Sequence, residues 1–319
     1  MPQPTPSDVH VDAILTNLSV AYIQRAEAFI ASRIFPVIPV EKQSDKYYTY
    51  TKGDWFRDEA RRRAPATESA GSGYGLSTAS YSCDVWALHK DIPDQVRYNA
   101  DAPINLDREA TQFLAQRMML RLEKQWVSDY FGTGIWATDK TGGTDFTKWS
   151  DYAASDPVTN IEDAKETMLS TTGYMPNTLV LGYQVFRQLK NHPDIIDRFK
   201  YTSAQNITAE LLARVFEVDR ILIATAIENT AREGAAVSMA FTHGKKALLC
   251  YVAPSPGLLQ PSAGYTFSWR GVSRGLGADV SVKRIRMEEI ESDRLETQMA
   301  WDNKVVATDL GYFFDTAVA

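Results

Sequence analysis

The sequence predicts an α+β fold, and three observations carry this prediction. Residues 105–131 run without a glycine or a proline, which predicts one long helix. Residues 159–258 alternate between short helical patterns and apolar strand patterns. From residue 265 to the end, stretches with apolar side chains at every second position predict antiparallel β-structure. The length of 319 residues fits one large domain or two ordinary ones.

The composition is that of a folded protein. The chain is 44% hydrophobic and 11% aromatic, and 34 Lys and Arg stand against 40 Asp and Glu, for a net charge of −6. These values disfavour a disordered chain and a strongly basic nucleic-acid binder. Cys83 and Cys250 are the only cysteines and lack CxxC spacing, which favours a reducing compartment. Because no signal-peptide pattern and no long apolar run is present, we expect a soluble chain.

The first 46 residues are expected to form an arm rather than a domain. Residues 1–12 are polar and rich in proline, so they should be extended. Between residues 11 and 35, apolar side chains at three- and four-residue spacing predict a short amphipathic helix. This helix should end before the extended segment PVIPV at residues 36–40.

Residues 47–92 predict a long β-hairpin. Two β-prone stretches, 47–60 and 78–92, flank a tip rich in glycine and serine. With roughly 20 residues in each arm at ~3.3 Å per residue, the hairpin would reach about 50–60 Å, beyond the ~20 Å radius of gyration of a compact chain of this length. It must therefore fold back along the body or leave it. The tip contains GSGYG, but a strand-like segment follows, so we interpret it as a flexible tip and not as a phosphate-binding loop.

The long helix at 105–131 is expected to be a central strut within residues 93–158. Asn105 or Asp107 could cap its start. Its apolar side chains occupy more than one side, since one set steps by four from Ala110 to Tyr130 and a second set contains Phe113 and Val127. Such a helix should be packed on several sides.

Residues 159–258 predict an α/β unit, and residues 259–319 a β-rich end. The first helix of the unit has Asn160 as a candidate N-cap and Gly173 as a candidate C-cap. A buried strand TLVLG follows, then a helix that stops before Pro193. Further along the chain come a helix at 207–216 and strands at 220–228 and 247–253.

No motif predicts catalysis or a cofactor. The segment GVSRG matches a nucleophile elbow around Ser273, but that motif needs a following helix and a later histidine. All four histidines precede Ser273 and the segment continues as β-structure, so a bend between strands is the better interpretation. The histidines also lack metal-ligand spacing. We therefore expect no enzyme, no cofactor and no metal.

Two charged clusters remain as candidate contact sites. Arg57 and Arg61, Arg62 and Arg63 form the one dense basic cluster, on the predicted hairpin. They could touch a DNA backbone, or pair with an acidic face of a neighbouring subunit. The acidic candidates are Glu288, Glu289, Glu291 and Asp293. The sequence leaves both partners of the basic cluster open.

The order of these elements resembles the major capsid protein of tailed double-stranded DNA bacteriophages. The segment PINLDREATQFLAQRMMLRLEKQWVSDYFGTGIWATD is similar to the spine helix and following loop of that family. MPNTLVLGYQVFRQLKNHPDIIDRFKY and ITAELLARVFEVDRILIATAIENTA are similar to segments of its A-domain. The resemblance implies an N-arm at 1–46, an E-loop at 47–92, a first P-domain part at 93–158, an A-domain at 159–258 and a second P-domain part at 259–319.

The resemblance implies a structural virion protein that assembles through hexamers and pentamers into an icosahedral head. Its E-loop would lie on a neighbouring subunit, with Trp55, Tyr74 and the four arginines as contacts. The implied partners are other copies of the chain, a portal protein and double-stranded DNA bound without sequence specificity, with no membrane. A decoration protein stays open. Some members carry a scaffolding segment ahead of the arm; here only about ten residues precede the first predicted helix, so a separate scaffolding protein or a processed chain is expected.

The resemblance also implies a location in the virion, and in the host cytoplasm during assembly. Two alternatives remain. One is an encapsulin-like bacterial compartment, which nuclease-protected DNA inside the particles would exclude. The other is a serine hydrolase at Ser273, which labelling of that residue by a fluorophosphonate would support.

Overall fold

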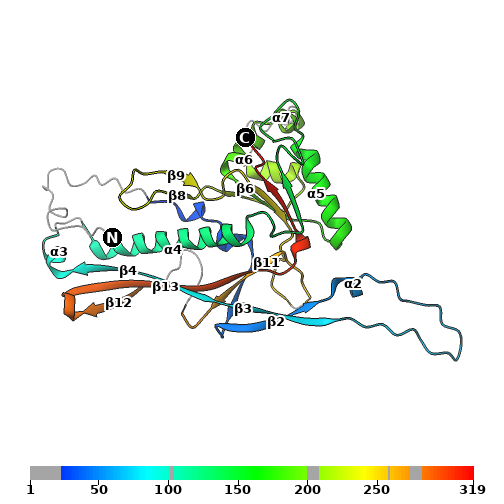
Figure 1. Ribbon diagram of the computed structural model, residues 1–319, viewed down its shortest axis with the longest axis horizontal. Helices are drawn as coiled ribbons and strands as arrows, with labels where there is room; N and C mark the ends of the chain where they lie inside the picture. Colours follow the sequence, from blue (N-terminus) through cyan, green and yellow to red (C-terminus); the bar gives the residue numbers. More distant parts are fainter. Residues whose placement is uncertain (1–22, 101–103, 200–207, 258, 273–281) are drawn as a thin grey trace.

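A computed structural model describes residues 23–100, 104–199, 208–257, 259–272 and 282–319. The molecule is long in one direction, with a layer of one helix on a sheet and an α/β unit above one end of that layer (Figure 1). In the layer, helix α4 (Leu106–Tyr130) lies along strands β4 (Asp84–Pro93) and β13 (Ser292–Val305). A hairpin projects from the body at the end that carries the α/β unit. The predicted α+β class is confirmed.

Helix α4 agrees with the prediction to within one residue at each end. Asn105 is the N-cap, and its side chain accepts a hydrogen bond from the backbone N–H of Arg108. Six apolar side chains at steps of four are buried, namely Ala110, Leu114, Met118, Leu122, Trp126 and Tyr130. Phe113, in contrast, is 40% exposed. The expected packing on several sides is present in the second half of the helix, where Tyr130 donates to the Tyr265 carbonyl of the sheet and the fully buried Glu123 accepts the N–H of Ala31 from the N-terminal segment.

The sheet beneath α4 has the order β1-β11-β13-β12, and β4 also pairs with β13. Its other members are β1 (Val37–Val40), β11 (Gly264–Trp269) and β12 (Val282–Met287). The long strand β13 pairs antiparallel with β4 over ten residues, from Ser292↔Pro93 to Trp301↔Asp84. The antiparallel β-structure predicted near the C-terminus is present in β11, β12 and β13.

The α/β unit is built on a second sheet with the order β5-β14-β10-β6-β7. Its strands are β5 (Thr138–Thr141), β6 (Thr178–Gly182), β7 (Arg220–Ala224), β10 (Ala247–Cys250) and β14 (Gly311–Asp315). Two of them, β5 and β14, come from outside residues 159–258. The apolar strand β14 therefore completes this sheet instead of the β-rich layer, where its almost fully buried side chains would have only one covered face.

Four helices belong to this unit: α5 (Pro157–Thr172), α6 (Tyr183–Lys190), α7 (Pro193–Phe199) and α8 (Ala209–Val215). Helix α5 begins after Asp156, whose carboxylate accepts the N–H groups of Val158 and Thr159 at 3.1 and 3.0 Å. The expected N-cap at Asn160 is wrong, because its side chain instead accepts from the indole N–H of Trp149 at 3.0 Å. Gly173 is the C-cap with φ of +75°, as predicted.

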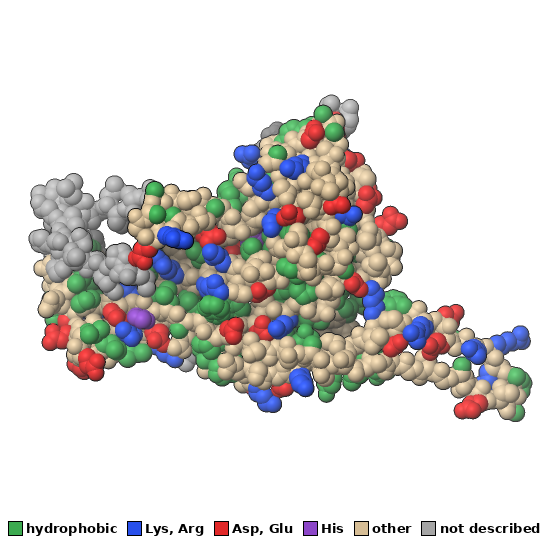
Figure 2. Space-filling model, in the orientation of Figure 1, with side chains coloured by type: hydrophobic (Ala, Val, Ile, Leu, Met, Phe, Trp, Pro, Cys, Tyr) green, Lys and Arg blue, Asp and Glu red, His purple; other side chains and the backbone are tan. Residues whose placement is uncertain are grey.

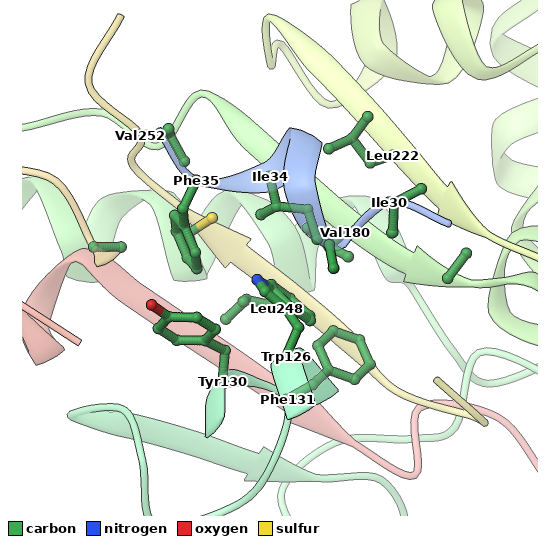
Figure 3. Close-up of a cluster of buried hydrophobic side chains, with 14 of the residues drawn as sticks. Ile30, Ile34, Phe35, Trp126, Tyr130, Phe131, Val180, Leu222, Leu248 and Val252 are labelled. Atoms are coloured by element: carbon green, nitrogen blue, oxygen red, sulfur yellow. The ribbon is translucent and has the colours of Figure 1, made fainter. Parts of the chain in front are cut away.

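The described part of the N-terminal segment is not one helix. It contains a 3-10 turn (Ala26–Ala28) and the short helix α1 (Ala31–Ile34); residues 1–22, including the extended start, lie outside the described residues. The expected helix up to residue 35 is therefore wrong there. Ile30, Ile34 and Phe35 enter the core beside Trp126 and Tyr130 (Figure 3). The 3-10 turn and helix α1 thus place three apolar side chains within six residues in one core.

The predicted hairpin is shorter in its paired part than expected. Strand β2 (Ser44–Tyr50) pairs antiparallel with β3 (Leu76–Ser82) in the register Ser44↔Ser82 to Tyr50↔Leu76. The strand expected up to residue 60 ends at Tyr50, because the chain turns into helix α2 (Lys52–Trp55). The other expected arm is divided, since β4 leaves the ribbon to pair with β13. Residues 56–75 carry no regular structure and form the projecting tip (Figure 1).

The remaining short elements are a helix, a ribbon and two turns. Helix α3 (Asp94–Tyr98) follows β4 directly. Strands β8 (Ile227–Asn229) and β9 (Met239–Phe241) form a two-stranded ribbon near α4. The 3-10 turn Glu288–Ile290 joins β12 to β13, and the 3-10 turn Thr308–Leu310 precedes β14.

Candidate assembly surfaces

The β2–β3 ribbon has one face turned to its own subunit and one turned to solvent. On the inner face, the rings of Tyr47 and Tyr81 pack on Phe267 with centroid distances of 5.5 and 4.5 Å. Because side chains alternate along a strand, Tyr48 and the facing pair Tyr50↔Leu76 lie on the opposite face. Tyr48 is 59% exposed and Leu76 is 54% exposed. Large apolar side chains thus remain on a surface that its own body does not cover.

The two predicted aromatic contacts extend this outer face. The ring centroid of Trp55 lies 5.4 Å from that of Tyr74, and both rings lie about 6 Å from Tyr50. The structure therefore brings Trp55 and Tyr74 together in one exposed cluster. We call the set Tyr48, Tyr50, Trp55, Tyr74 and Leu76 the outer aromatic face.

Three members of the outer aromatic face, Tyr48, Tyr50 and Leu76, are not among the predicted contacts. The alternation in SDKYYTY was the signal that could have found the two tyrosines. Leu76 follows from the register of the ribbon, which the sequence alone does not supply.

At its base the hairpin is bonded to the body, and its two arms are hydrogen-bonded to each other. Lys52 Nζ lies 2.6 Å from a carboxylate oxygen of Asp309, which precedes β14. The carboxylate of Asp54 accepts the N–H of Gly75 at 2.9 Å, and the N–H of Thr51 donates to the Gly75 carbonyl at 3.2 Å. The direction of the projecting tip is thereby set by contacts at its base.

The four predicted arginines lie on the projecting part, and two of them have contacts there. Arg57 lies 3.6 Å from the Asp54 carboxylate, and Arg63 donates from Nε to the Thr67 carbonyl. Arg61 and Arg62 are exposed and make no hydrogen bond or ion pair with any described residue. Figure 2 shows basic side chains toward the far end of the hairpin, with acidic side chains beside them.

The predicted acidic residues lie at the turn between β12 and β13, and they divide into two kinds. Glu288, Glu289 and Glu291 are exposed. Asp293 is only 7% exposed. It accepts from Arg284, and it lies 2.9 Å from a guanidinium nitrogen of Arg97. Asp293 thus anchors the turn from its buried side, and little of its surface is accessible to a neighbouring subunit.

The arginines around Asp293 connect several elements. Arg286 on β12 lies 3.4 Å from Asp293 and also donates to both carboxylate oxygens of Asp94, at 2.8 and 2.6 Å. The hydrogen bond from Arg284 is the main cause that lowers the pKa of Asp293, opposed by burial. The exposed part of the acidic face therefore consists of Glu288, Glu289 and Glu291 on a turn held by β12, β13 and α3.

The acidic turn and the basic tip lie at opposite ends of the molecule. In Figure 1 the β12–β13 turn lies at one end of the long axis and the hairpin tip at the other. The two charged groups therefore cannot meet within one subunit.

One serine–histidine–aspartate arrangement occurs among the described residues, at Ser155, His192 and Asp194. Ser155 Oγ lies 3.0 Å from His192 Nε2, but the hydroxyl donates to the Asp151 carbonyl at 2.6 Å. His192 Nδ1 accepts the backbone N–H of Asp194 at 3.3 Å. This bond favours the tautomer with its proton on Nε2, and the buried serine donates to the Asp151 carbonyl and not to the imidazole. The buried Ser155 and His192 link the loop before α5 to the turn between α6 and α7; Ser273 lies outside the described residues.

The described residues contain no group of three His, Cys, Asp or Glu side chains arranged to hold a metal ion. Among the described helices, none has the length and the apolar character needed to cross a bilayer.

Known proteins resemble the chain over nearly its full length. No protein-family model matches it. A major capsid protein of Burkholderia phage BcepMu is 30% identical over 268 residues, which cover 82% of this chain and 84% of that protein. A major capsid protein of Pseudomonas phage JBD67 is 26% identical over 323 residues, with 97% of each chain covered.

Solved structures share the fold. A phage-related protein from Bordetella bronchiseptica RB50 matches with a TM-score of 0.68 at 24% identity, covering 92% of this chain and 94% of that one. The capsid structure of cyanophage P-SCSP1u matches with a TM-score of 0.65 at 12% identity, with 98% and 94% covered. The holo-SrpI encapsulin complex from Synechococcus elongatus PCC 7942 also matches, with a TM-score of 0.51 at 12% identity and coverages of 96% and 93%. Since the phage relatives match in both sequence and extent, the chain belongs to the family of bacteriophage major capsid proteins.

Proposed function

We propose that this protein builds the icosahedral head shell of a bacteriophage through hexamers and pentamers. The single observation that carries this function is the projecting hairpin, whose outer aromatic face stays exposed on its own subunit. A monomer gains nothing from such a face, whereas a shell can bury it between subunits. Membership in the capsid family supports the same function. The division into N-arm, E-loop, spine helix, A-domain and P-domain belongs to this proposal.

The hairpin would contact a neighbouring copy through two kinds of side chain. Trp55 and Tyr74 would supply buried apolar area, and aromatic side chains are enriched at the centres of protein interfaces. Arg57, Arg61, Arg62 and Arg63 would pair with the exposed glutamates Glu288, Glu289 and Glu291 of a neighbour. The position of the two groups at opposite ends of the long axis supports this pairing over one within the subunit. Asp293 would act indirectly, by holding the acidic turn.

Other partners follow from a shell that encloses a genome. A separate scaffolding protein and a portal protein would take part in assembly in the host cytoplasm, and a decoration protein could bind the finished shell. Packaged double-stranded DNA would be held without sequence readout. A net charge of −6 suits this, because a strongly basic wall would hinder release of the DNA.

The shell would have no catalytic role of its own. The arrangement at Ser155, His192 and Asp194 supports this, because its hydrogen bonds leave the serine without a base. Reaction of the full chain with a fluorophosphonate should leave Ser155 and Ser273 unlabelled. Stoichiometric labelling of either serine would contradict the non-enzymatic role.

A second candidate is the shell of a bacterial compartment, which the similarity in fold to an encapsulin complex favours. Particles from an infected host should separate the two functions after nuclease treatment. A phage head should retain protected double-stranded DNA inside its shell. Particles that contain a cargo enzyme and no protected DNA would overturn the phage function in favour of the compartment.

A further inference from the structure

Glu123 is a fully buried acid at which two distant segments of the chain meet α4. Its side chain is 0% exposed, on the buried side of the helix. One carboxylate oxygen, Oε2, accepts the backbone N–H groups of Ile30 and Ala31 at 3.0 and 2.8 Å. These two bonds tie the N-terminal segment 26–35 to the middle of α4.

The other oxygen faces the loop between β9 and β10. Glu123 Oε1 lies 3.6 Å from Nδ1 of His243, which is also 0% exposed at its side chain. Among the described residues, neither Glu123 Oε1 nor His243 Nε2 has a hydrogen-bond partner. The imidazole is enclosed by aromatic rings, stacked on Trp126 at 5.6 Å and edge-on to Phe131 at 4.9 Å. His243 Nδ1 also lies 3.1 Å from the Thr242 hydroxyl oxygen, so the imidazole has a nearer partner than Glu123 Oε1.

Among the described residues, no Lys or Arg forms an ion pair with the Glu123 carboxyl. Glu27 and Arg33 line a cavity of about 240 Å³ that Glu123 also lines, and neither forms an ion pair with it. The next residue on α4, Lys124, is paired with Glu228 on β8 at 2.5 Å. A carboxylate at this position would therefore be a buried charge without a salt bridge.

We propose that Glu123 is a proton-controlled latch between the N-terminal segment 26–35, helix α4 and the β9–β10 loop. The neutral acid holds the three segments together, because an uncharged carboxyl can accept the two N–H groups without a buried charge. Loss of the proton places an uncompensated charge between them, and the N-terminal segment then opens more readily. The latch goes beyond the proposed shell function and operates in a single subunit.

The direction of the pH dependence follows from burial. Burial raises the pKa of Glu123 from its ordinary 4.5 to about 7, opposed by the two backbone hydrogen bonds. It also lowers the pKa of His243 to about 3, and because opening of segment 26–35 leaves the imidazole packed against Trp126 and Phe131, it stays uncharged in both forms above about pH 4.5. Between pH 4.5 and about 7 the closed form binds a proton that the open form lacks. Opening therefore becomes easier as the pH rises through this window, and levels off above it.

Hydrogen–deuterium exchange of the full chain tests the latch. Peptides covering residues 26–35 are measured at about pH 5 and about pH 8, with rates corrected for the intrinsic pH dependence of amide exchange. The wild type should lose on the order of tenfold protection or more at the higher pH. Glu123→Gln should show no such change, because glutamine has nearly the same shape and does not ionise. Glu109→Gln, at an exposed position of the same helix, should behave like the wild type.

Two results would overturn the latch: equal corrected protection of the wild type at both pH values, or the same pH-dependent loss in Glu123→Gln. If Glu123→Gln does not fold, infrared difference spectra of the wild type decide the matter. A protonated carboxyl band that disappears between about pH 6 and pH 8 supports the latch. Spectra in which every carboxyl has lost its proton by about pH 5.5 contradict it.

Discussion

Asp293 is the residue around which the acidic end of the molecule is organised. It lies on β13 beneath the turn that carries the three exposed glutamates. Arg97 comes from α3 and Arg284 from β12, so one carboxylate joins three elements. In the sequence Asp293 is one acid of a run and cannot be told apart from its neighbours, since its burial depends on which strands flank β13.

Replacing Asp293 by asparagine should lower the melting temperature at neutral pH by a few degrees. Three arginines would lose their shared anion, and hydrogen bonds to charged groups are among the stronger ones. The wild-type pKa of Asp293 is lowered from 3.8, mainly by Arg284, so its contribution is present above that value and lost as the pH falls below it. Thermal unfolding from about pH 3 to pH 7 should show a weaker acid dependence in Asp293→Asn than in the wild type. Identical curves would contradict the role given to Asp293.

Gly182 is a position where a side chain has no room. A Cβ there would lie 2.1 Å from the Gly244 carbonyl oxygen, where the end of β6 meets the turn before β10. Gly182→Ala should therefore destabilise the protein by about 1–3 kcal/mol, as overpacking does. Gly71→Ala is the matched control, because nothing lies within 4 Å of its Cβ position. Equal melting temperatures for the two variants would show that the β6–β10 contact yields without strain.

At the scale of elements, the two faces of strand β2 in the β2–β3 ribbon have different roles. Tyr47 points to the core beside Phe267, and its neighbour Tyr48 points to solvent. An isolated two-stranded ribbon is marginally stable in water, so its inner face needs the body and its outer face is free for a partner. Tyr47 thus contributes to folding of the subunit, and Tyr48 is available for contact with another subunit.

Tyr48→Ser should leave the melting temperature nearly unchanged but reduce the yield of assembled particles. Tyr48 is 59% exposed in the subunit, so its loss removes little buried area there. Tyr47→Ser is the matched control and should lower the melting temperature, because that ring packs on Phe267. Calorimetry and sedimentation of both variants check the pair of outcomes. Normal particle yield from Tyr48→Ser would contradict an intersubunit role for the outer aromatic face.

The elements differ in how far the sequence predicts them. Helix α4 was predicted closely because its signals are local: no glycine or proline interrupts it, and Asn105 caps it. The strand expected at 47–60 ends early because α2 forms at its end. The hydrogen bond between Asp54 and Gly75, which are distant in the chain, stabilises this turn. The place of β14 in the second sheet was missed, since its pairing with β10 joins residues far apart in the chain. The outer aromatic face was predicted only in part, because the position of Leu76 in it depends on the register between β2 and β3.

At the scale of the whole molecule, opposite charges stand at opposite ends. The basic tip belongs to the projecting hairpin, and the acidic turn ends the β12–β13 hairpin. Complementary charged patches steer association and fix its register more than they add affinity. In the proposed shell, this distribution would suit head-to-tail contact between copies, which a closed ring or shell can satisfy.

Reversing the charge of Arg61, Arg62 and Arg63 to glutamate should impair assembly, through like-charge repulsion with the acidic turn of a neighbour. Reversing Glu288, Glu289 and Glu291 to lysine in the same chain should restore particles, since the attraction returns with its signs exchanged. Light scattering during assembly would follow both variants. Shells that form normally from the arginine variant but retain less DNA would instead assign the cluster to the DNA backbone.

The most direct test of a shell-forming subunit is an electron cryomicroscopy map of the particles formed by the full chain with its scaffolding protein. The map should show a closed shell in which the outer aromatic face of each hairpin is buried on a neighbouring subunit. Its basic tip should lie near the turn Glu288–Ile290 of another copy. A chain that stays monomeric under all assembly conditions, or a shell in which the outer aromatic face remains in solvent, would contradict this function for the hairpin.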